Sequence, residues 1–391
     1  MDTDAYSGFV SVDVDQISCQ FKIGILGGTH YYDASDDVLS IPPRFFRAAL
    51  ESTKRAVEFF RSRETTVIAH LGDVLAAENG DGGSQWTALQ SFNNVRSKLP
   101  GVSWHIAPGA SDARCFGPDG IGPALSSPGR APSDRSYYSF FPAARWRVLV
   151  LDCCDTTSGF SSASSSSGLP DGVLVGASGG LGPAQLTWLS AQLSVASAEG
   201  ERVIVLSNRG VRGGDLLTNA SEVQQKLSAH PGVVAAFVSL GDGSGHYEKD
   251  SQGVHHISPL AIINRDINED AHGCLEVYDD KLKLEMVGSR PDPSRLPNGW
   301  PTELELPRGG ALVTSDGTAA IGFFLQFLFY MLTVIATPLA PVMRMLTSNE
   351  GVEDGEIGDD AAPAPPPPPP QPASKPPESG APAADEAGTV V

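Results

Sequence analysis

The sequence predicts an α/β fold in which two β-sheets form a sandwich flanked by helices. Short apolar runs rich in Val and Ile alternate with longer stretches that carry apolar residues at helical spacing. Later in the chain, two apolar runs meet at Asp279-Asp280, a pair typical of a hairpin-like turn. Strand-helix alternation followed by antiparallel pieces indicates a sandwich of sheets with helices on its outer faces.

Each expected element follows from the local spacing of apolar residues. The first expected helix begins behind the Pro42-Pro43 pair and places Phe46, Ala49, Val57 and Phe60 at helical intervals. Helices are expected over residues 42–61, 85–99 and 185–197. Strands are expected over residues 21–26, 66–71, 104–107, 146–151, 203–206, 233–238, 261–264, 274–278 and 281–287.

Charge and cysteine content exclude several classes of protein. The chain has 391 residues and a net charge of −19, whereas nucleic acids and anionic lipid surfaces are bound by clustered Lys and Arg. We therefore expect no nucleic-acid partner. Five scattered cysteines without a C-x-x-C pair form neither a zinc-ribbon spacing nor a disulfide framework, which favours a reducing compartment.

Composition divides the chain into a globular part and a C-terminal part of different character. The start of the chain is acidic and is followed by no apolar stretch of the kind found in signal peptides. The expected segments are an N-terminal extension (1–19), a globular domain (20–290), a linker (291–317), a transmembrane helix (318–342) and a disordered acidic Pro-rich tail (343–391).

The segment Ala319–Ala340 contains no charged residue over 22 positions. About 20 such residues span a bilayer as a helix. A buried core helix is the alternative, but the segment lacks a polar face and follows the expected end of the domain. We expect a single-pass membrane protein whose globular domain lies on the cytosolic side, because no signal peptide precedes it.

The C-terminal tail contains six consecutive prolines, Pro365–Pro370. Such a run adopts the polyproline II conformation and can dock into the aromatic-lined groove of a polyproline-binding domain. An unstructured acidic tail without a specific partner is the alternative.

Five segments, each a strand followed by a polar loop, lie in the order of the metal-binding loops of two-metal phosphoesterases. They cover residues 23–30, 70–76, 105–112, 203–208 and 237–247, and further similarity lies at 137–140, 146–152, 179–189 and 247–256. On these residues the chain resembles the calcineurin-like metallophosphoesterase superfamily, and within it the ADP-ribose/CDP-alcohol diphosphatase group. The resemblance extends from about residue 20 to residue 290 and implies the sandwich fold of that family.

The resemblance implies a pair of divalent cations about 3.5–4 Å apart, held by Asp, Asn and His side chains from the five loops. In this chain two of those ligands remain: His30 stands at the His of the first motif, and Asp73 stands at the bridging carboxylate. The other positions are changed, with Gly28, Ala76, Ala110, Ser111 and Asn208 standing where the family has metal-binding or catalytic side chains.

Other polar residues in the same loops are candidate substitute ligands: Asp112, Asn208, Asp242 and His246, the last of them shifted from the family register. Built around Asp73 and completed by water, such a set could hold one Mg, Mn or Ca ion. We expect no cofactor, or one divalent cation if any. His255 and His256 match a family pattern outside the metal set, where substrate binding and strand packing are both consistent with them.

The leading functional hypothesis is a membrane-tethered pseudoenzyme that has lost two-metal catalysis and binds a nucleotide-like ligand or a protein in the old cleft. Depletion of the metal ligands supports it, because two adjacent dications repel each other unless several anionic ligands neutralise them. Two alternatives remain open. The chain could be an active metal-dependent hydrolase of nucleoside diphosphate-linked substrates with a remodelled site, or a structural membrane adaptor.

Overall fold

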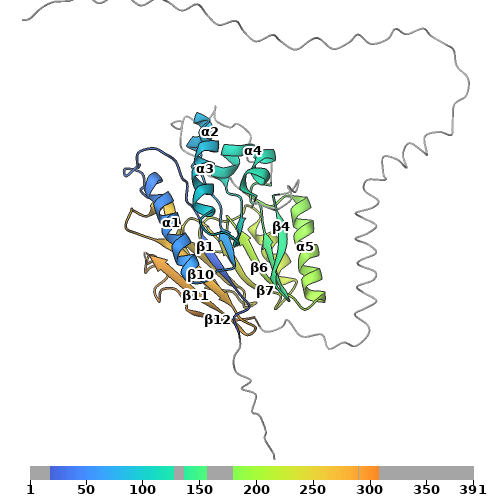
Figure 1. Cartoon of the computed structure of the whole chain (residues 1–391). Coiled ribbons are helices and arrows are strands. Elements are labelled where there is room, and N and C mark those ends of the chain that lie inside the picture. Colours follow the sequence, from blue (N-terminus) through green and yellow to red (C-terminus); the bar gives the residue numbers. More distant parts are fainter. Residues whose placement is uncertain (1–17, 127–135, 156–178, 289, 308–391) are drawn as a thin grey trace, which may run out of the picture. The chain divides into compact units, whose positions relative to one another are not determined.

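The computed structural model describes residues 18–126, 136–155, 179–288 and 290–307. Within them, two sheets of six strands each have the orders β12-β11-β10-β1-β2-β3 and β4-β5-β6-β7-β9-β8. Helices lie along the outside of the sheets, with α1 beside the first sheet and α5 beside the second (Figure 1). The predicted α/β sandwich flanked by helices is confirmed for these residues.

The first sheet combines parallel and antiparallel pairs. Strand β1 is parallel to β2, and β2 to β3, whereas β10 is antiparallel to both β1 and β11. The residues between β10 and β11 include the predicted turn at Asp279-Asp280, which this pairing confirms. The strands are β1 (Phe21–Leu26), β2 (Val67–His70), β3 (Ser103–Ile106), β10 (Ala271–Val277), β11 (Lys281–Gly288) and β12 (Glu303–Glu305).

The second sheet has a parallel centre formed by β5, β6, β7 and β9, with antiparallel β4 and β8 at its edges. Because parallel strands end at the same edge, the loops that follow them collect there. The strands are β4 (Tyr138–Ala143), β5 (Trp146–Val150), β6 (Arg202–Ser207), β7 (Val234–Ser239), β8 (Ser244–Lys249) and β9 (His255–Leu260).

The helices cover the sheets with apolar faces. On α1 the side chains of Ala49, Val57 and Phe60 are fully buried, as their helical spacing predicts. Pro183 occupies the first turn of α5, where a missing N–H costs nothing. The helices are α1 (Phe46–Ser62), α2 (Glu78–Gly82), α3 (Gln85–Arg96), α4 (Ala110–Leu125), α5 (Pro183–Ala198) and α6 (Ala220–Ser228).

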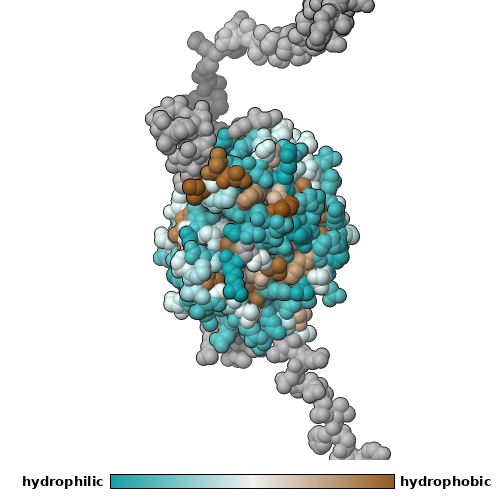
Figure 2. Space-filling view, turned by 90° about the vertical axis from the view of Figure 1, so that its left-hand side faces the viewer, coloured by the Kyte–Doolittle hydropathy of each residue, from teal (hydrophilic) through white to brown (hydrophobic). Residues whose placement is uncertain are grey.

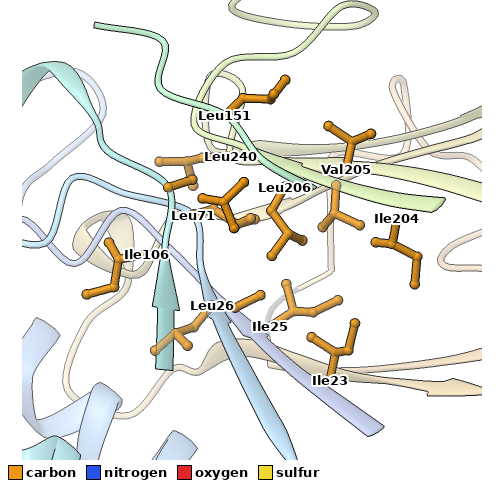
Figure 3. Packing of buried hydrophobic residues seen from close by; sticks show 14 of the residues in the cluster. Ile23, Ile25, Leu26, Leu71, Ile106, Leu151, Ile204, Val205, Leu206 and Leu240 are labelled. Atoms are coloured by element: carbon orange, nitrogen blue, oxygen red, sulfur yellow. The ribbon is translucent and has the colours of Figure 1, made fainter. Parts of the chain in front are cut away.

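The core lies between the sheets, where apolar side chains from β1 and β6 fill the space together with Leu71 and Leu240 (Figure 3). Ile25 and Val205 are completely buried. A strand that is covered on both faces has a continuous apolar run of residues, and for this reason β1 and β6 could be predicted from the sequence. On the outer surface, Figure 2 shows apolar residues in small groups among hydrophilic ones.

Two expectations about elements and boundaries differ from the structure. Residues 261–264 were expected to form a strand, but Ile262–Asn264 form the 3-10 helix η2. The reason is that Ile262 and Ile263 donate their backbone N–H groups to the loop after β1, at Gly27 and Gly28, rather than to a neighbouring strand. The domain also continues past residue 290, because β12 pairs with β11 inside the expected linker of residues 291–317.

The expected transmembrane helix with Ala319–Ala340, and the tail with Pro365–Pro370, lie outside the described residues. No helix within the described ranges has the length and apolar character needed to cross a bilayer.

Candidate metal centre

Loops from both sheets meet at the ends of β2 and β6. The Asn208 side chain, which follows β6, donates from Nδ2 to the Leu71 carbonyl at 2.8 Å and to Asp73 Oδ2 at 3.0 Å. The Gly241 N–H donates in turn to the Asn208 carbonyl at 2.9 Å. These bonds join the second, fourth and fifth predicted loops into one site.

His30 and Asp73 have positive φ angles of 43° and 53°, which non-glycine residues rarely adopt. The backbone pairs the two loops, since the His30 N–H donates to the Asp73 carbonyl at 2.7 Å. Gly28 likewise donates to the Gly72 carbonyl at 3.0 Å. Such conformations persist where surrounding structure enforces them, and they are frequent at functional sites.

A buried histidine beneath these loops holds the turn that carries Asp73. His70 Nδ1 accepts the Gly72 N–H at 3.2 Å, so the opposite nitrogen Nε2 donates to Thr29 Oγ1 at 2.9 Å. Burial lowers the pKa of His70 to about 3, with the nearby Arg96 charge acting in the same direction. His70 therefore stays neutral at physiological pH and acts as a positioning residue, a role that its sequence context did not indicate.

Ser111 completes a compact cluster with His30 and Asp73. Its hydroxyl lies 3.3 Å from His30 Nδ1, and its backbone N–H donates to Asp73 Oδ1 at 3.0 Å. His30 Nε2 lies 3.8 Å from Asp73 Oδ2. Burial lowers the pKa of His30 more strongly than the Asp73 charge raises it. The structure thus brings together His30, Asp73 and Asn208 as expected, and adds Ser111.

The candidate ligand Asp112 is a structural carboxylate. It is completely buried, and its Oδ1 accepts the N–H groups of Val74 and Leu75 at 2.8 and 3.2 Å. Its Oδ2 accepts the Gly109 N–H at 3.1 Å. Burial raises its pKa to about 8, and these bonds oppose that rise. Both oxygens of Asp112 thus accept backbone N–H groups, and metal binding by Asp112 stays a prediction.

Asp242 and His246 have partners other than Asp73. Arg295 Nη1 donates to Asp242 Oδ2 at 2.6 Å, and Ser244 N–H donates to Oδ1 at 3.0 Å. Burial alone would raise the Asp242 pKa, but these bonds outweigh it and the pKa is lowered. His246 lies 3.7 Å from Glu248 on β8. Neither residue has a hydrogen bond or ion pair with His30 or Asp73, and their roles as substitute ligands stay predictions.

His255 and His256 have hydrogen-bond partners within the fold. His255 Nε2 donates to the Glu305 carbonyl at 2.8 Å, so its Nδ1 accepts the Tyr247 hydroxyl at 2.9 Å. His256 Nε2 lies 3.0 Å from Asp250 Oδ2. Both rings are buried, so strand packing and loop hydrogen bonding account for them without a substrate.

The donor set does not fit a pair of metal ions. No group of three or more His, Cys, Asp or Glu side chains in the described ranges is placed to hold a metal. Asn208 presents its N–H to Asp73, and its oxygen faces Cys153 Sγ at 3.8 Å. What remains is His30 with Asp73, whose facing atoms are separated by a distance that one cation could bridge with water completing its shell.

Gly28, which the resemblance aligns with a metal-binding Asp, has a backbone conformation and a close neighbour that disfavour a larger side chain. Gly28 has φ +62°, and a Cβ there would lie 2.9 Å from the Ala261 Cβ. We expect Gly28→Asp to lower the free energy of unfolding by about 1–3 kcal/mol and not to add a tight metal site. Chemical denaturation with a manganese titration tests this, with Gly83→Asp as the control. Gly83 also has positive φ, but its Cβ position is open. Gain of tight manganese binding in Gly28→Asp would contradict the expectation.

Comparison with known proteins agrees with the predicted resemblance, although no family model matches the chain. A manganese-dependent ADP-ribose/CDP-alcohol diphosphatase from Oryza sativa subsp. japonica is 29% identical over 309 residues, covering 69% of this chain and 91% of the rice protein. The protein of the same name from Xenopus tropicalis is 27% identical over 315 residues, covering 68% and 92%. The crystal structure of a dimetal phosphatase from Danio rerio superposes with a TM-score of 0.61 at 22% identity, covering 74% of this chain and all of that one.

These relatives correct the expectation that the chain uses no cofactor. Their name states manganese dependence, and the matched structure is described as a dimetal phosphatase, so the comparisons point to a divalent metal. The chain therefore has the calcineurin-like metallophosphoesterase fold and is a homologue of the ADP-ribose/CDP-alcohol diphosphatases.

Proposed function

We propose that this chain is a phosphoesterase homologue that binds a nucleoside diphosphate-linked ligand together with a single divalent cation and has lost two-metal hydrolysis. The observation that carries the proposal is the environment of Asp73. One of its oxygens accepts the Ser111 N–H and the other the Asn208 amide, which leaves His30 as the neighbouring family ligand. A carboxylate engaged in this way is a poor bridge between two dications.

Single-cation binding is expected to be weak and to depend on Asp73. With one imidazole and one carboxylate as protein ligands, the dissociation constant for Mn²⁺ should be about 10⁻⁴ M or weaker. Titration of the full-length protein, followed by calorimetry or the manganese EPR signal, should give one site. Asp73→Asn should weaken binding at least about tenfold, because it removes the anionic ligand.

Asp242→Asn is the matched control, because it removes a carboxylate that the structure ties to Arg295. Its manganese affinity should equal that of the unmodified protein. If both substitutions weaken binding equally, the cation is not held between His30 and Asp73.

The ligand is tested separately from the cation. Saturating ADP-ribose or CDP-choline should raise the melting temperature of the full-length protein, because a ligand that binds only the folded state adds stability. The relatives' name motivates this choice of ligands. Manganese-dependent cleavage of either compound, lost in Asp73→Asn, would instead establish the remodelled hydrolase.

A further inference from the structure

A cavity of about 480 Å³ lies at the end of β11, lined by residues other than those of the metal centre. Leu260, Ala271 and Leu296 line it with buried side chains, and Met286 and Trp300 line it with partly exposed ones. Its volume falls within the range of about 300–1,000 Å³ that is typical of small-molecule sites.

Local hydrogen bonds stabilise residues 291–300, which form one side of this cavity. The Asp292 carbonyl accepts the N–H groups of Arg295 and Leu296 at 2.9 and 3.0 Å, and the Leu296 carbonyl accepts that of Gly299 at 3.0 Å. The Arg295 side chain ties the segment to Asp242 across the β7–β8 turn. A wall held in this way is preorganised, so a ligand spends little binding energy on ordering it.

Arg290 lines the same cavity and is exposed. Within the described part of the chain its guanidinium has neither a hydrogen bond nor an ion pair. Most of the other described arginines pair with a carboxylate, in a chain whose net charge is −19. Such pairs involve Arg44, Arg47, Arg55, Arg61, Arg63, Arg147, Arg209, Arg212, Arg265 and Arg295.

We propose that this cavity is a binding site for a small organic anion with an aromatic or aliphatic body. Arg290 would hold the anionic head, since a guanidinium binds carboxylate or phosphate oxygens through two parallel hydrogen bonds. Trp300 and Met286 would contact the apolar body, which an indole ring and a flexible thioether accommodate well. A cation that has no ion-pair partner among the described residues, beside a cavity lined in part by Trp300 and Met286, is complementary to this class of ligand and not to a metal ion.

Binding of 2-naphthoate to the full-length protein, measured by calorimetry, tests the proposal. The neutral isostere 2-naphthamide should bind at least about tenfold more weakly, because it lacks the charge that Arg290 pairs with. Arg290→Gln should remove this preference, so that acid and amide bind equally. Lys98→Gln is the matched control: it removes the same charge from an exposed helix-flanking position and should leave the preference intact.

Several results would overturn the proposal. One is the absence of saturable binding by 2-naphthoate at millimolar concentrations, and another is equal affinity for the acid and the amide in the unmodified protein. A third is displacement of 2-naphthoate by ADP-ribose in the presence of Mn²⁺, which would place the probe in the metal centre. Tighter binding of 2-naphthyl phosphate than of 2-naphthoate would instead support the proposal and identify phosphate as the preferred anionic head.

Discussion

Full-length protein supplied with Mn²⁺ is expected to cleave ADP-ribose and CDP-choline at least about 10³-fold more slowly than the rice diphosphatase assayed beside it. A pair of metal ions activates the attacking water and neutralises charge that develops on the phosphate. The resemblance aligns Ser111 with a His that acts on the leaving group, and Gly28 with a metal-binding Asp. Loss of a single transition-state donor already costs about 10²–10³ in rate, so several losses together should remove most of the acceleration.

The assay needs a control for contaminating phosphatases, because a trace of a fast enzyme would mimic slow turnover. Asp73→Asn serves this purpose: residual cleavage that survives the substitution does not come from this site. Turnover within tenfold of the rice protein that disappears in Asp73→Asn would contradict the proposed loss of catalysis.

Asp112→Ala is expected to lower the free energy of unfolding by about 2–4 kcal/mol. The substitution leaves the buried N–H groups of Val74, Leu75 and Gly109 without their acceptor. An unsatisfied buried donor costs more than the net value of the bond it formed, and three donors are affected here. Urea denaturation followed by circular dichroism measures the change.

Two further variants separate this explanation from a general loss of a carboxylate. Asp112→Asn keeps one acceptor oxygen of similar shape and should be less destabilising than Asp112→Ala. Asp242→Ala removes a partly exposed carboxylate paired with Arg295 and should cost less than about 1 kcal/mol. Equal destabilisation by the Asp112 and Asp242 substitutions to Ala would argue against the buried-acceptor role of Asp112.

Local patterns in the sequence were sufficient for much of the fold. Residues 21–26 were predicted as a strand from their apolar run, and β1 has these bounds because both of its faces are covered. The strand expected at 261–264 failed, since an apolar run cannot show that its N–H groups will bond to Gly27 and Gly28. Residues after 290 were expected to be a linker, because a three-residue strand such as β12 has too few positions to show an alternating pattern.

The candidate site was predictable where a residue keeps its place after a strand, and not where a distant partner decides its orientation. His30 and Asp73 follow adjacent parallel strands and meet for that reason. Asp242 has suitable chemistry for a ligand, but Arg295, 53 positions later, binds it. Asp112 is one residue from Ser111, yet its carboxylate faces backbone N–H groups. Residue type and spacing do not determine how the carboxylates of Asp112 and Asp242 are oriented.

Anomalous diffraction from manganese-soaked crystals of the full-length protein counts the bound ions and locates them. We expect one manganese peak, located between His30 Nε2 and Asp73 Oδ2. Two peaks about 3.5–4 Å apart in the same cleft would contradict it, because they would show that the remaining side chains still neutralise a pair of dications.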